Sequence, residues 1–155
     1  MTDPAGPAGT AWSLFLTANA VLVEEIERRL AAAGLPTLDW YDALWALERA
    51  EGQRLRMHEF AYWMVTSRSN ITRLIDRLET AGLVRRERTD EDRRGAYAVL
   101  SPEGRRMRKR MWLVYEKAIG ELFEQHLSAT ELRHTEVAMH KLIAANRIPL
   151  ARRRG

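Results

Sequence analysis

The sequence predicts a mainly α-helical protein in which two short helices are followed by a two-stranded β-hairpin. Two observations lead to this expectation. Apolar residues recur at three- and four-residue steps through most of the 155 residues, which is the period of an amphipathic helix. Between residues 83 and 100 the period changes, and two β-prone stretches enclose a polar segment.

The composition excludes several classes of protein. Hydrophobic residues make up 46% of the chain and charged residues 30%, so a core can be buried and the chain is not compositionally disordered. No apolar run reaches the roughly 18 residues of a membrane-spanning helix, and no basic cluster marks a signal peptide. Cysteine is absent, which excludes disulfides, thiolate metal sites and a cysteine nucleophile. We therefore expect a cytoplasmic protein without a membrane partner.

The net charge of +4 is carried almost entirely by arginine, since Lys109, Lys117 and Lys141 are the lysines. The planar guanidinium suits phosphate and base edges, which favours a nucleic-acid partner. Genomic composition produces the same arginine bias, so the charge alone does not decide the function. The placement of the charges is more informative.

The first helix covers residues 12–30. Its apolar stripe consists of Trp12, Phe15, Leu16, Ala20, Val23, Ile26 and Leu30. Gly34 and Pro36 end this helix, and Thr37 is placed to cap a second one over residues 38–47. Asp39 in that second helix has the pattern of ordinary helix-surface charge. Gly52 breaks the helix, and residues 54–56 alternate like a very short strand.

The next elements form a pair of helices joined by a tight turn. Residues 57–64 predict a short helix and residues 65–67 a turn, in which Ser67 is the expected N-cap of a helix over residues 68–81. Gly82 stands where a left-handed C-cap is expected. The buried stripe of this helix would be Ile71, Leu74, Ile75 and Leu78.

A hairpin and two further helices complete the chain. Residues 83–88 and 96–100 read as strands around a polar tip, and Ser101 with Pro102 then starts a long helix that we expect to continue to Leu127. Ser128 and Glu131 form a capping box for a last helix that runs to Asn146.

The order helix, turn, helix, hairpin is that of a winged helix-turn-helix. We assign residues 38–100 to this domain and residues 10–35 and 102–147 to helices of a dimerisation platform. Residues 1–9 and 148–155 are expected to be flexible termini. The platform follows from the apolar stripes of its helices, which a chain of this length cannot cover alone, and two-fold pairing is the commonest solution.

The polar face of the 68–81 helix carries the residue types that DNA recognition uses. Hydroxyl groups and a helix N-terminus bind phosphate, whereas asparagine and arginine read adenine and guanine edges. The predicted major-groove residues are Ser67, Ser69, Asn70, Thr72, Arg73 and Arg77. The alternative is a solvated helix face on which Asp76 lies near the two arginines.

The hairpin tip predicts a second DNA contact. Asp92, Arg93 and Arg94 lie at or just after the turn, and an arginine on a thin wing can enter a narrow minor groove. Asp92 would hold such an arginine in one orientation by a bidentate pair. A merely solvated turn is the alternative.

These motifs resemble one known family. The segment SRSNITRLIDRLETAGLVRR (residues 67–86) closely resembles the recognition helix and first wing strand of MarR-family transcriptional regulators. The sequence from Asp92 to Arg94 is similar to that family's Asp-x-Arg wing signature, and the LSPEG sequence at 100–104 stands where the family has Leu-Thr-x-x-Gly. The resemblance is strong from residue 55 to 104 and depends on helix order elsewhere.

The resemblance implies a homodimer whose first, fifth and sixth helices form the interface. It also implies that Arg94 enters the minor groove with Asp92 supporting it. Two reading heads then lie about one helical turn of DNA apart, roughly 34–36 Å, on a pseudo-palindromic operator. A repressor is the expected role.

Aromatic residues raise the hypothesis of a ligand pocket, because family members often bind small aromatic anions between the dimerisation helices and the winged domain. The candidates are Trp12, Trp40, Tyr41, Trp45 and Trp112. The alternative is that these side chains only fill the core and the dimer interface.

No pattern in the sequence predicts catalysis or a cofactor. The four histidines lack metal-ligand spacing, and no catalytic triad, glycine-rich phosphate loop or zincin motif occurs. We expect a regulator that binds double-stranded DNA rather than an enzyme. The alternative of a different class is a winged-helix module that binds proteins and never meets nucleic acid.

Overall fold

The computed structural model describes residues 6–64, 70–88 and 96–146. Most of them are helical, in α1 (Gly6–Ala32), α2 (Leu38–Arg49), α3 (Met57–Trp63), α4 (Ile71–Thr80), α5 (Pro102–Leu122) and α6 (Ala129–Asn146). The strands are β1 (Arg54–Arg56), β2 (Val84–Arg88) and β3 (Ala96–Leu100), and two short 3₁₀ turns cover Glu51–Gln53 and Glu124–His126. The mainly helical winged helix-turn-helix that the sequence predicts is confirmed.

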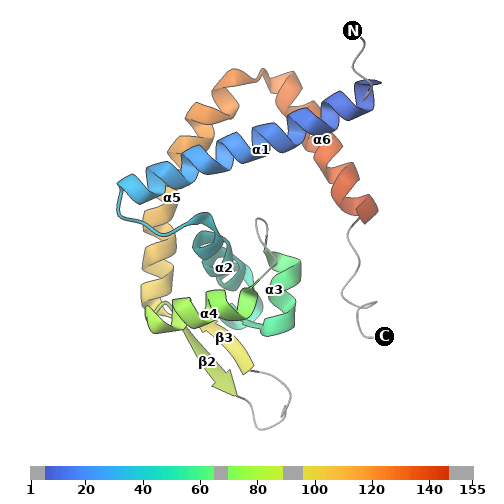
Figure 1. The fold of residues 1–155 in the computed structure, drawn as a ribbon. Coiled ribbons are helices and arrows are strands. Elements are labelled where there is room, and N and C mark those ends of the chain that lie inside the picture. Colours follow the sequence, from blue (N-terminus) through green and yellow to red (C-terminus); the bar gives the residue numbers. More distant parts are fainter. Residues whose placement is uncertain (1–5, 65–69, 89–95, 147–155) are drawn as a thin grey trace.

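The strands form one antiparallel sheet in the order β1-β3-β2. Ala98 of β3 pairs with Leu55 of β1 on one side and with Arg86 of β2 on the other. Figure 1 shows the two longer strands below α4, with the hairpin extending away from the rest of the molecule. The pairing of β3 with β1 joins the hairpin to the strand that directly precedes α3.

The winged lobe has a continuous apolar core between α2, α3, α4 and the sheet. Phe60, Leu44, Leu47, Ile75 and Leu78 are completely buried in it. The alternating strand pattern turns Ala98 and Leu100 inward, so the sheet closes the side of the core that the helices leave open.

The terminal helices pack differently. In Figure 1, α1 crosses α5 above the winged lobe, and its N-terminal half extends toward α6. Ile26 and Leu30, near the C-terminal end of α1, are buried against a second cluster with Met111 and Ala118 of α5. Among the described residues of α6, none is buried. The ends of this platform therefore leave apolar surface uncovered.

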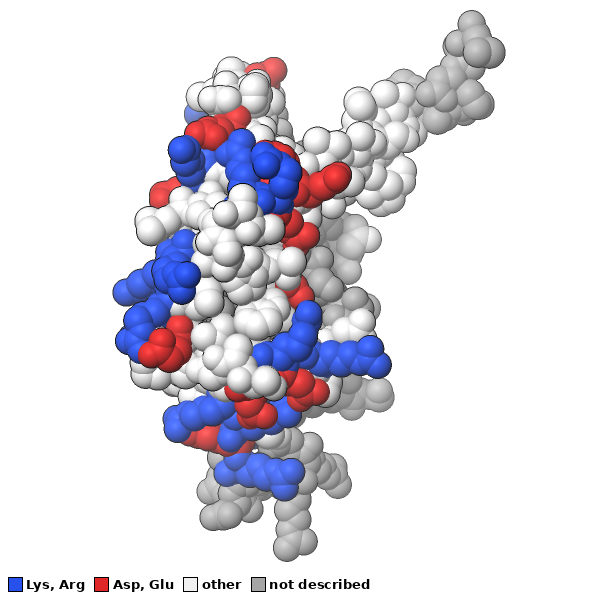
Figure 2. Space-filling view, turned by 60° about the vertical axis from the view of Figure 1, so that its left-hand side comes forward, with Lys and Arg blue, Asp and Glu red and all other residues white. Residues whose placement is uncertain are grey.

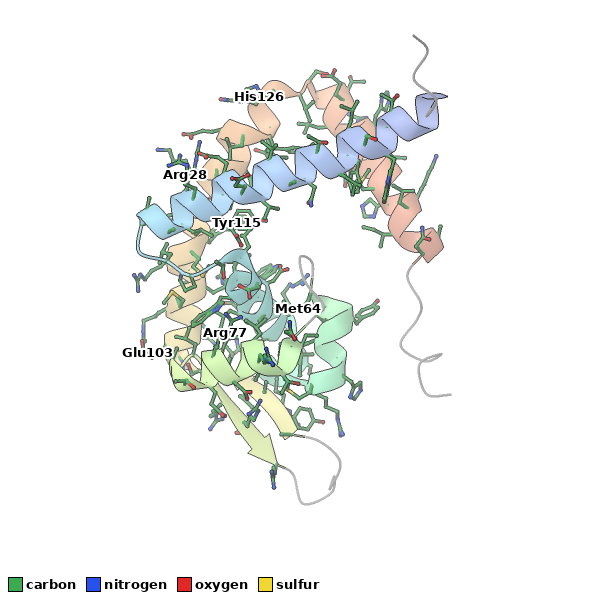
Figure 3. The ribbon with its side chains drawn as sticks, in the orientation of Figure 1. Arg28, Met64, Arg77, Glu103, Tyr115 and His126 are labelled. Atoms are coloured by element: carbon green, nitrogen blue, oxygen red, sulfur yellow. The ribbon has the colours of Figure 1, made fainter. Side chains whose placement is uncertain are left out.

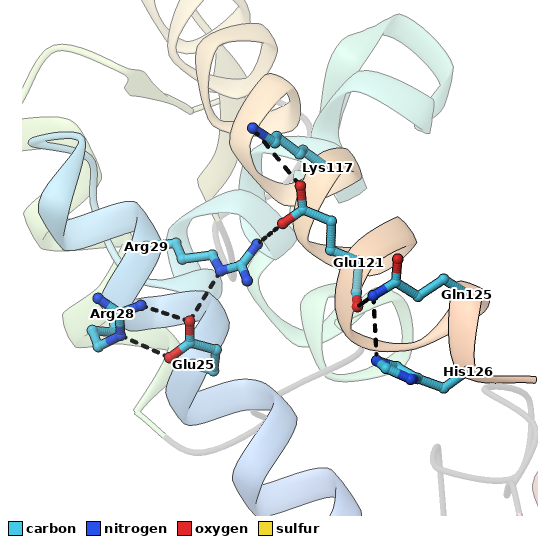
Figure 4. A network of polar contacts seen from close by, with 7 residues as sticks. All are labelled: Glu25, Arg28, Arg29, Lys117, Glu121, Gln125 and His126. Atoms are coloured by element: carbon cyan, nitrogen blue, oxygen red, sulfur yellow. Dashed lines mark hydrogen bonds and ion pairs between the residues drawn. The ribbon is translucent and has the colours of Figure 1, made fainter.

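A polar network fastens α1 to α5 (Figure 4). The guanidinium of Arg29 donates to Glu25 on its own helix at 3.0 Å and to Glu121 of α5 at 2.6 Å. Lys117 lies 3.8 Å from the same Glu121 carboxylate. Arg28 also binds Glu25, and these hydrogen bonds lower the pKa of Glu25 to about 2.

Local signals in the sequence place several helix ends correctly. Gly82 has a φ of +75° and follows α4 in a Schellman motif, in which the Leu83 N–H donates to the Leu78 carbonyl. The Ser101 hydroxyl accepts from the Gly104 N–H at 3.0 Å and caps α5. Ser128 and Glu131 form the predicted capping box of α6.

Three predicted boundaries are wrong. Asn70 is the N-cap of α4 and has a left-handed backbone with a φ of 57°, so the helix starts at Ile71 rather than at residue 68 with Ser67 as its cap. Asparagine tolerates this conformation better than most side chains. Helix α1 starts at Gly6, six residues before the first residue of the helix expected over residues 12–30, and a proline is compatible with a first helical turn.

The third error concerns the end of α5, which stops at Leu122 instead of continuing to Leu127. The Gln125 side chain donates to the Glu121 carbonyl at 2.6 Å. This carbonyl is the group that would accept from the Gln125 backbone N–H in a continuing helix, so the side chain replaces a helical bond at the start of the 3₁₀ turn.

Candidate nucleic-acid interface

The exposed face of α4 presents a compact polar surface. Leu74, Ile75 and Leu78 are buried, whereas Arg73 and Arg77 on the opposite side are exposed. The 3.6-residue period separates the two sets, since one turn of helix brings Arg73 and Arg77 to the same side. Thr72 is also exposed, at the edge of this face.

An open cavity of about 500 Å³ gathers four of these side chains. It is lined by Asn70, Arg73, Asp76 and Arg77. Asn70 is the first described residue before α4, and its side chain makes no capping hydrogen bond. The structure therefore brings together Asn70, Arg73 and Arg77, which the sequence singled out, and Asp76 lines the same cavity.

The two arginines of α4 differ in their contacts. Arg77 donates from Nη2 to the Asp39 carboxylate of α2 at 3.1 Å, and its side chain remains 57% exposed. Arg73 makes no ion pair with another described residue. Figure 3 shows Arg77 on the side of α4 that faces α2. One arginine of the surface is thus held by the body of the lobe and the other is open to solvent.

Asp76 has a different partner from the one that the alternative of a solvated helix face gives it. Its carboxylate lies 2.6 Å from the guanidinium of Arg86 in β2, rather than beside Arg73 or Arg77. Glu79, one turn further along α4, lies 3.6 Å from the same guanidinium and accepts the Arg86 backbone N–H at 3.0 Å. Arg86 therefore ties the wing to α4, a role that only the strand register reveals.

Several predicted contact residues lie outside the described part of the chain. These are Ser67 and Ser69 before α4, and Asp92, Arg93 and Arg94 at the wing tip. Their interpretation as phosphate and minor-groove contacts stays a prediction.

Four of the five candidate pocket residues pack at one apolar cluster and differ in their nearest aromatic and charged neighbours. Tyr41 stacks on Trp112, with ring centroids 6.0 Å apart, and meets Tyr115 edge-on at 5.1 Å. Burial raises the pKa of both tyrosines, so their phenols stay protonated at neutral pH. Trp40 instead lines an open cavity of about 420 Å³ between α2 and α4, together with Asp76, Arg77, Thr80 and Ala81.

The other two tryptophans have different neighbours. Trp45 is flanked by the guanidinium groups of Arg49 and Arg108, each 5.1 Å from the ring centroid. Arg108 also forms an ion pair with Glu48 that is largely shielded from solvent. Trp12 is 62% exposed on α1 and contacts Phe15. Trp40, Tyr41, Trp45 and Trp112 all pack at the apolar cluster between α1, α2 and α5, whereas Trp12 lies on the exposed part of α1.

The surface charge is mixed rather than uniformly basic. On the face shown in Figure 2, Lys and Arg side chains alternate with acidic and uncharged ones. Among residues 6–64, 70–88 and 96–146, no helix combines the length and apolar character that crossing a bilayer requires. The same part of the chain holds no cluster of three or more His, Asp or Glu that could bind a metal ion.

Comparison with known proteins assigns the family. The model of the MarR family matches residues 33–95, which include α2 to α4 and the first wing strand. The HTH-type transcriptional regulator PrsX of Escherichia coli is 32% identical over 144 residues, covering 92% of this chain and 86% of PrsX. The chain belongs to the MarR family of transcriptional regulators. The expectation of a MarR-type regulator rather than an enzyme is thereby confirmed.

Two further comparisons extend over most of the chain. The transcriptional repressor MprA of Escherichia coli K12 is 30% identical, over 79% of this chain and 69% of MprA. The crystal structure of Sco3205, a MarR regulator from Streptomyces coelicolor in complex with DNA, aligns with a TM-score of 0.79 and 26% identity. That alignment covers 92% of this chain and 88% of Sco3205.

Proposed function

We propose that this MarR protein is a homodimeric, sequence-specific DNA-binding repressor that lays α4 into the major groove. The observation that carries the proposal is the exposed surface of Asn70, Arg73 and Arg77 on one side of a helix whose other side is buried. Arginine and asparagine at this spacing suit direct contact with base edges and phosphates.

The proposed dimer uses the residue ranges 10–35 and 102–147. Large apolar side chains on these helices are exposed in a single chain, which is uncommon unless a partner covers them. They include Trp12, Phe15, Leu16, Val21, Leu113, Val137, Leu142 and Ile143. A two-fold pairing would cover these side chains and present two copies of α4 to successive major grooves, about 34–36 Å apart.

The wing supplies the second part of the proposed interface. Arg94 would enter the minor groove and Asp92 would orient it, with Arg93 near the backbone. The ion pairs of Arg86 with Asp76 and Glu79 support this assignment, because they fix the first wing strand on α4. A repressor role is favoured by the similarity to MprA, whose name describes it as a repressor.

The direct test is a mobility-shift titration with DNA from upstream of the protein's own gene, repeated over a range of salt concentrations. We expect specific binding that weakens steeply with salt, since phosphate contacts release counterions. Arg73→Ala should cost about 1–3 kcal/mol on the specific site and relax preference at one base pair. Salt-independent or absent binding would instead favour a protein-interaction module.

The wing is tested separately. Arg94→Ala should weaken binding and remove any preference for A·T pairs at the flanks of the site. Binding equal to that of the wild type at moderate salt would contradict the wing assignment without affecting the assignment of α4.

We further propose that a small aromatic anion relieves repression by binding beside Trp40. The cavity there combines an indole ring with the Arg77 guanidinium, which suits an aromatic carboxylate. Such a ligand would compete with DNA for Arg77 and lower the affinity for the operator. Titration of tryptophan fluorescence with aromatic acids should saturate in the wild type and lose that response in Trp40→Leu.

A further inference from the structure

We propose that Asp39 of α2 positions Arg77 of α4, so that the guanidinium is held ready for the DNA backbone before binding. The inference rests on the proposed DNA-binding function and deepens it. Asp39 precedes Arg77 by 38 residues and follows the linker after α1. Its place in the sequence is that of a simple surface charge, and only the packing of α2 against α4 gives it this partner.

The Asp39 carboxylate is itself fixed by the start of α2. Its Oδ1 accepts the Trp40 backbone N–H at 3.0 Å and the hydroxyl of Thr37, the N-cap residue. The neighbouring Leu38 N–H donates to Glu27 of α1 at 3.2 Å, so the first turn of α2 is also held by the platform. The second oxygen, Oδ2, is the one that accepts from Arg77.

The geometry leaves Arg77 both oriented and accessible. The guanidinium has five N–H donors, and the bond to Asp39 at 3.1 Å uses Nη2. The side chain is 57% exposed while that of Asp39 is 25% exposed, so a phosphate can approach the arginine from solvent. Arg77 also lines both cavities on the exposed side of α4.

The orientation of Arg77 affects the affinity for DNA, because an unrestrained arginine side chain samples many rotamers before binding. Immobilising such a side chain at the moment of binding lowers the affinity, by about 3- to 10-fold for one residue. An arginine already held by a fixed carboxylate avoids most of this loss. Asp39 acts through Arg77 and does not contact DNA in this account.

A purely structural role for Asp39 gives a different expectation. An acidic residue in the first turn stabilises α2 through the helix dipole, and this effect is independent of Arg77. A carboxylate near the interface also repels phosphate, so its removal would strengthen DNA binding if it had no positioning role. The three roles are separated by the sign of the effect and by its dependence on Arg77.

The experiment measures binding of the full-length chain to its footprinted upstream DNA by fluorescence anisotropy, at several salt concentrations. We expect Asp39→Ala to weaken binding about 3- to 10-fold with an unchanged salt slope, because the number of phosphate contacts stays the same. Arg77→Ala should weaken binding and reduce the slope by about 0.9. In the Arg77→Ala background, Asp39→Ala should have no further effect.

Two controls accompany this series. Glu51→Ala removes one exposed carboxylate that lies outside α4 and outside the proposed dimer helices, and should leave the affinity within about twofold of the wild type. Asp39→Asn keeps the size of the side chain and should weaken binding in the same direction as Asp39→Ala, with a melting temperature close to that of the wild type.

Each alternative result has a definite meaning. Unchanged or tighter binding by Asp39→Ala, or an equal loss with and without Arg77, overturns the positioning role alone. A wild-type chain that shows no salt-dependent binding to the DNA overturns the proposed function, and the positioning role with it.

Discussion

The winged lobe and the terminal helices of this MarR protein differ in how much of their apolar side-chain surface is buried within one chain. The lobe has a core that is completely buried within one chain, as Phe60, Leu44 and Leu78 show. Helix α6 buries none of its described residues, and Leu142 and Ile143 are more than half exposed. The lobe is therefore complete as a folding unit, whereas the platform is expected to be completed by a second copy.

The largest loss of stability should come from a substitution that creates a cavity in the core of the winged lobe. Phe60→Ala removes a ring that is 0% exposed and should cost about 3–5 kcal/mol of unfolding free energy. Urea unfolding followed by circular dichroism measures this loss. Glu51→Ala in the lobe is the control, because that side chain is exposed and its truncation should change stability by about 0.5 kcal/mol or less.

The second prediction concerns substitutions in the terminal helices that leave the winged lobe unchanged. The double substitution Leu142→Glu/Ile143→Glu places charges on the exposed apolar face of α6 and should raise the dimer dissociation constant at least ~30-fold, about 2 kcal/mol. Sedimentation over a dilution series measures the change, and the far-ultraviolet spectrum should stay helical. A wild-type chain that sediments as a monomer at all concentrations would refute the proposed completion by a partner.

The third prediction concerns the junction between the two regions, where α5 leaves the sheet. A Cβ on Gly104 would lie 2.1 Å from the Leu83 carbonyl oxygen and 2.9 Å from Leu100. Gly104→Ala should therefore destabilise the protein by about 1–3 kcal/mol in thermal unfolding.

A second glycine of α5 provides the matched control for Gly104. A Cβ on Gly120 would meet nothing within 4 Å, so Gly120→Ala should stabilise the helix by about 0.5–1 kcal/mol. Equal effects at the two positions would show that helix propensity, and not the close approach to Leu83, decides the role of Gly104.

The smallest effect should come from the network between α1 and α5. Glu25 has a pKa lowered to about 2 by its bonds to Arg28 and Arg29, below the ordinary value of 4.5. A depressed carboxyl pKa contributes stability that is present above pH 4.5 and is lost as the pH falls toward 2.

This dependence can be measured with Glu25→Gln. The melting temperature of the variant should lie slightly below that of the wild type at pH 7, and the difference should vanish as the pH falls from 4.5 to 2. High salt should shrink the difference because the pair is solvent-accessible. A difference that persists at pH 2 would show that the contribution of Glu25 is not electrostatic.

The sequence predicts best those features of the fold that depend on residues close together in the chain. Helix periodicity, the turn at Gly82 and the caps at Ser101 and Ser128 depend on residues a few positions apart, and the structure has them where the sequence predicts. The polar face of α4 is predictable for the same reason, because Arg73 and Arg77 are one helical turn apart.

The boundaries that the sequence missed depend on conformations with weak sequence signals. Nothing in the local pattern distinguishes Asn70 from Ser67 as the start of α4, since both residue types are good caps. The end of α5 depends on the Gln125 side chain binding the Glu121 carbonyl, a competition that apolar periodicity does not detect.

The sequence by itself determined the helical and hairpin pattern, the buried face of α4 and the residues opposite it, because each of these follows from spacing along one element. The tertiary structure decided which charges meet, pairing Arg77 with Asp39 and Arg86 with Asp76, and it gathered four of the candidate aromatic residues at one apolar cluster while Trp12 stays exposed. Those partners are brought together by the packing of α2, α4 and the sheet, and long-range packing has no fixed spacing in the sequence.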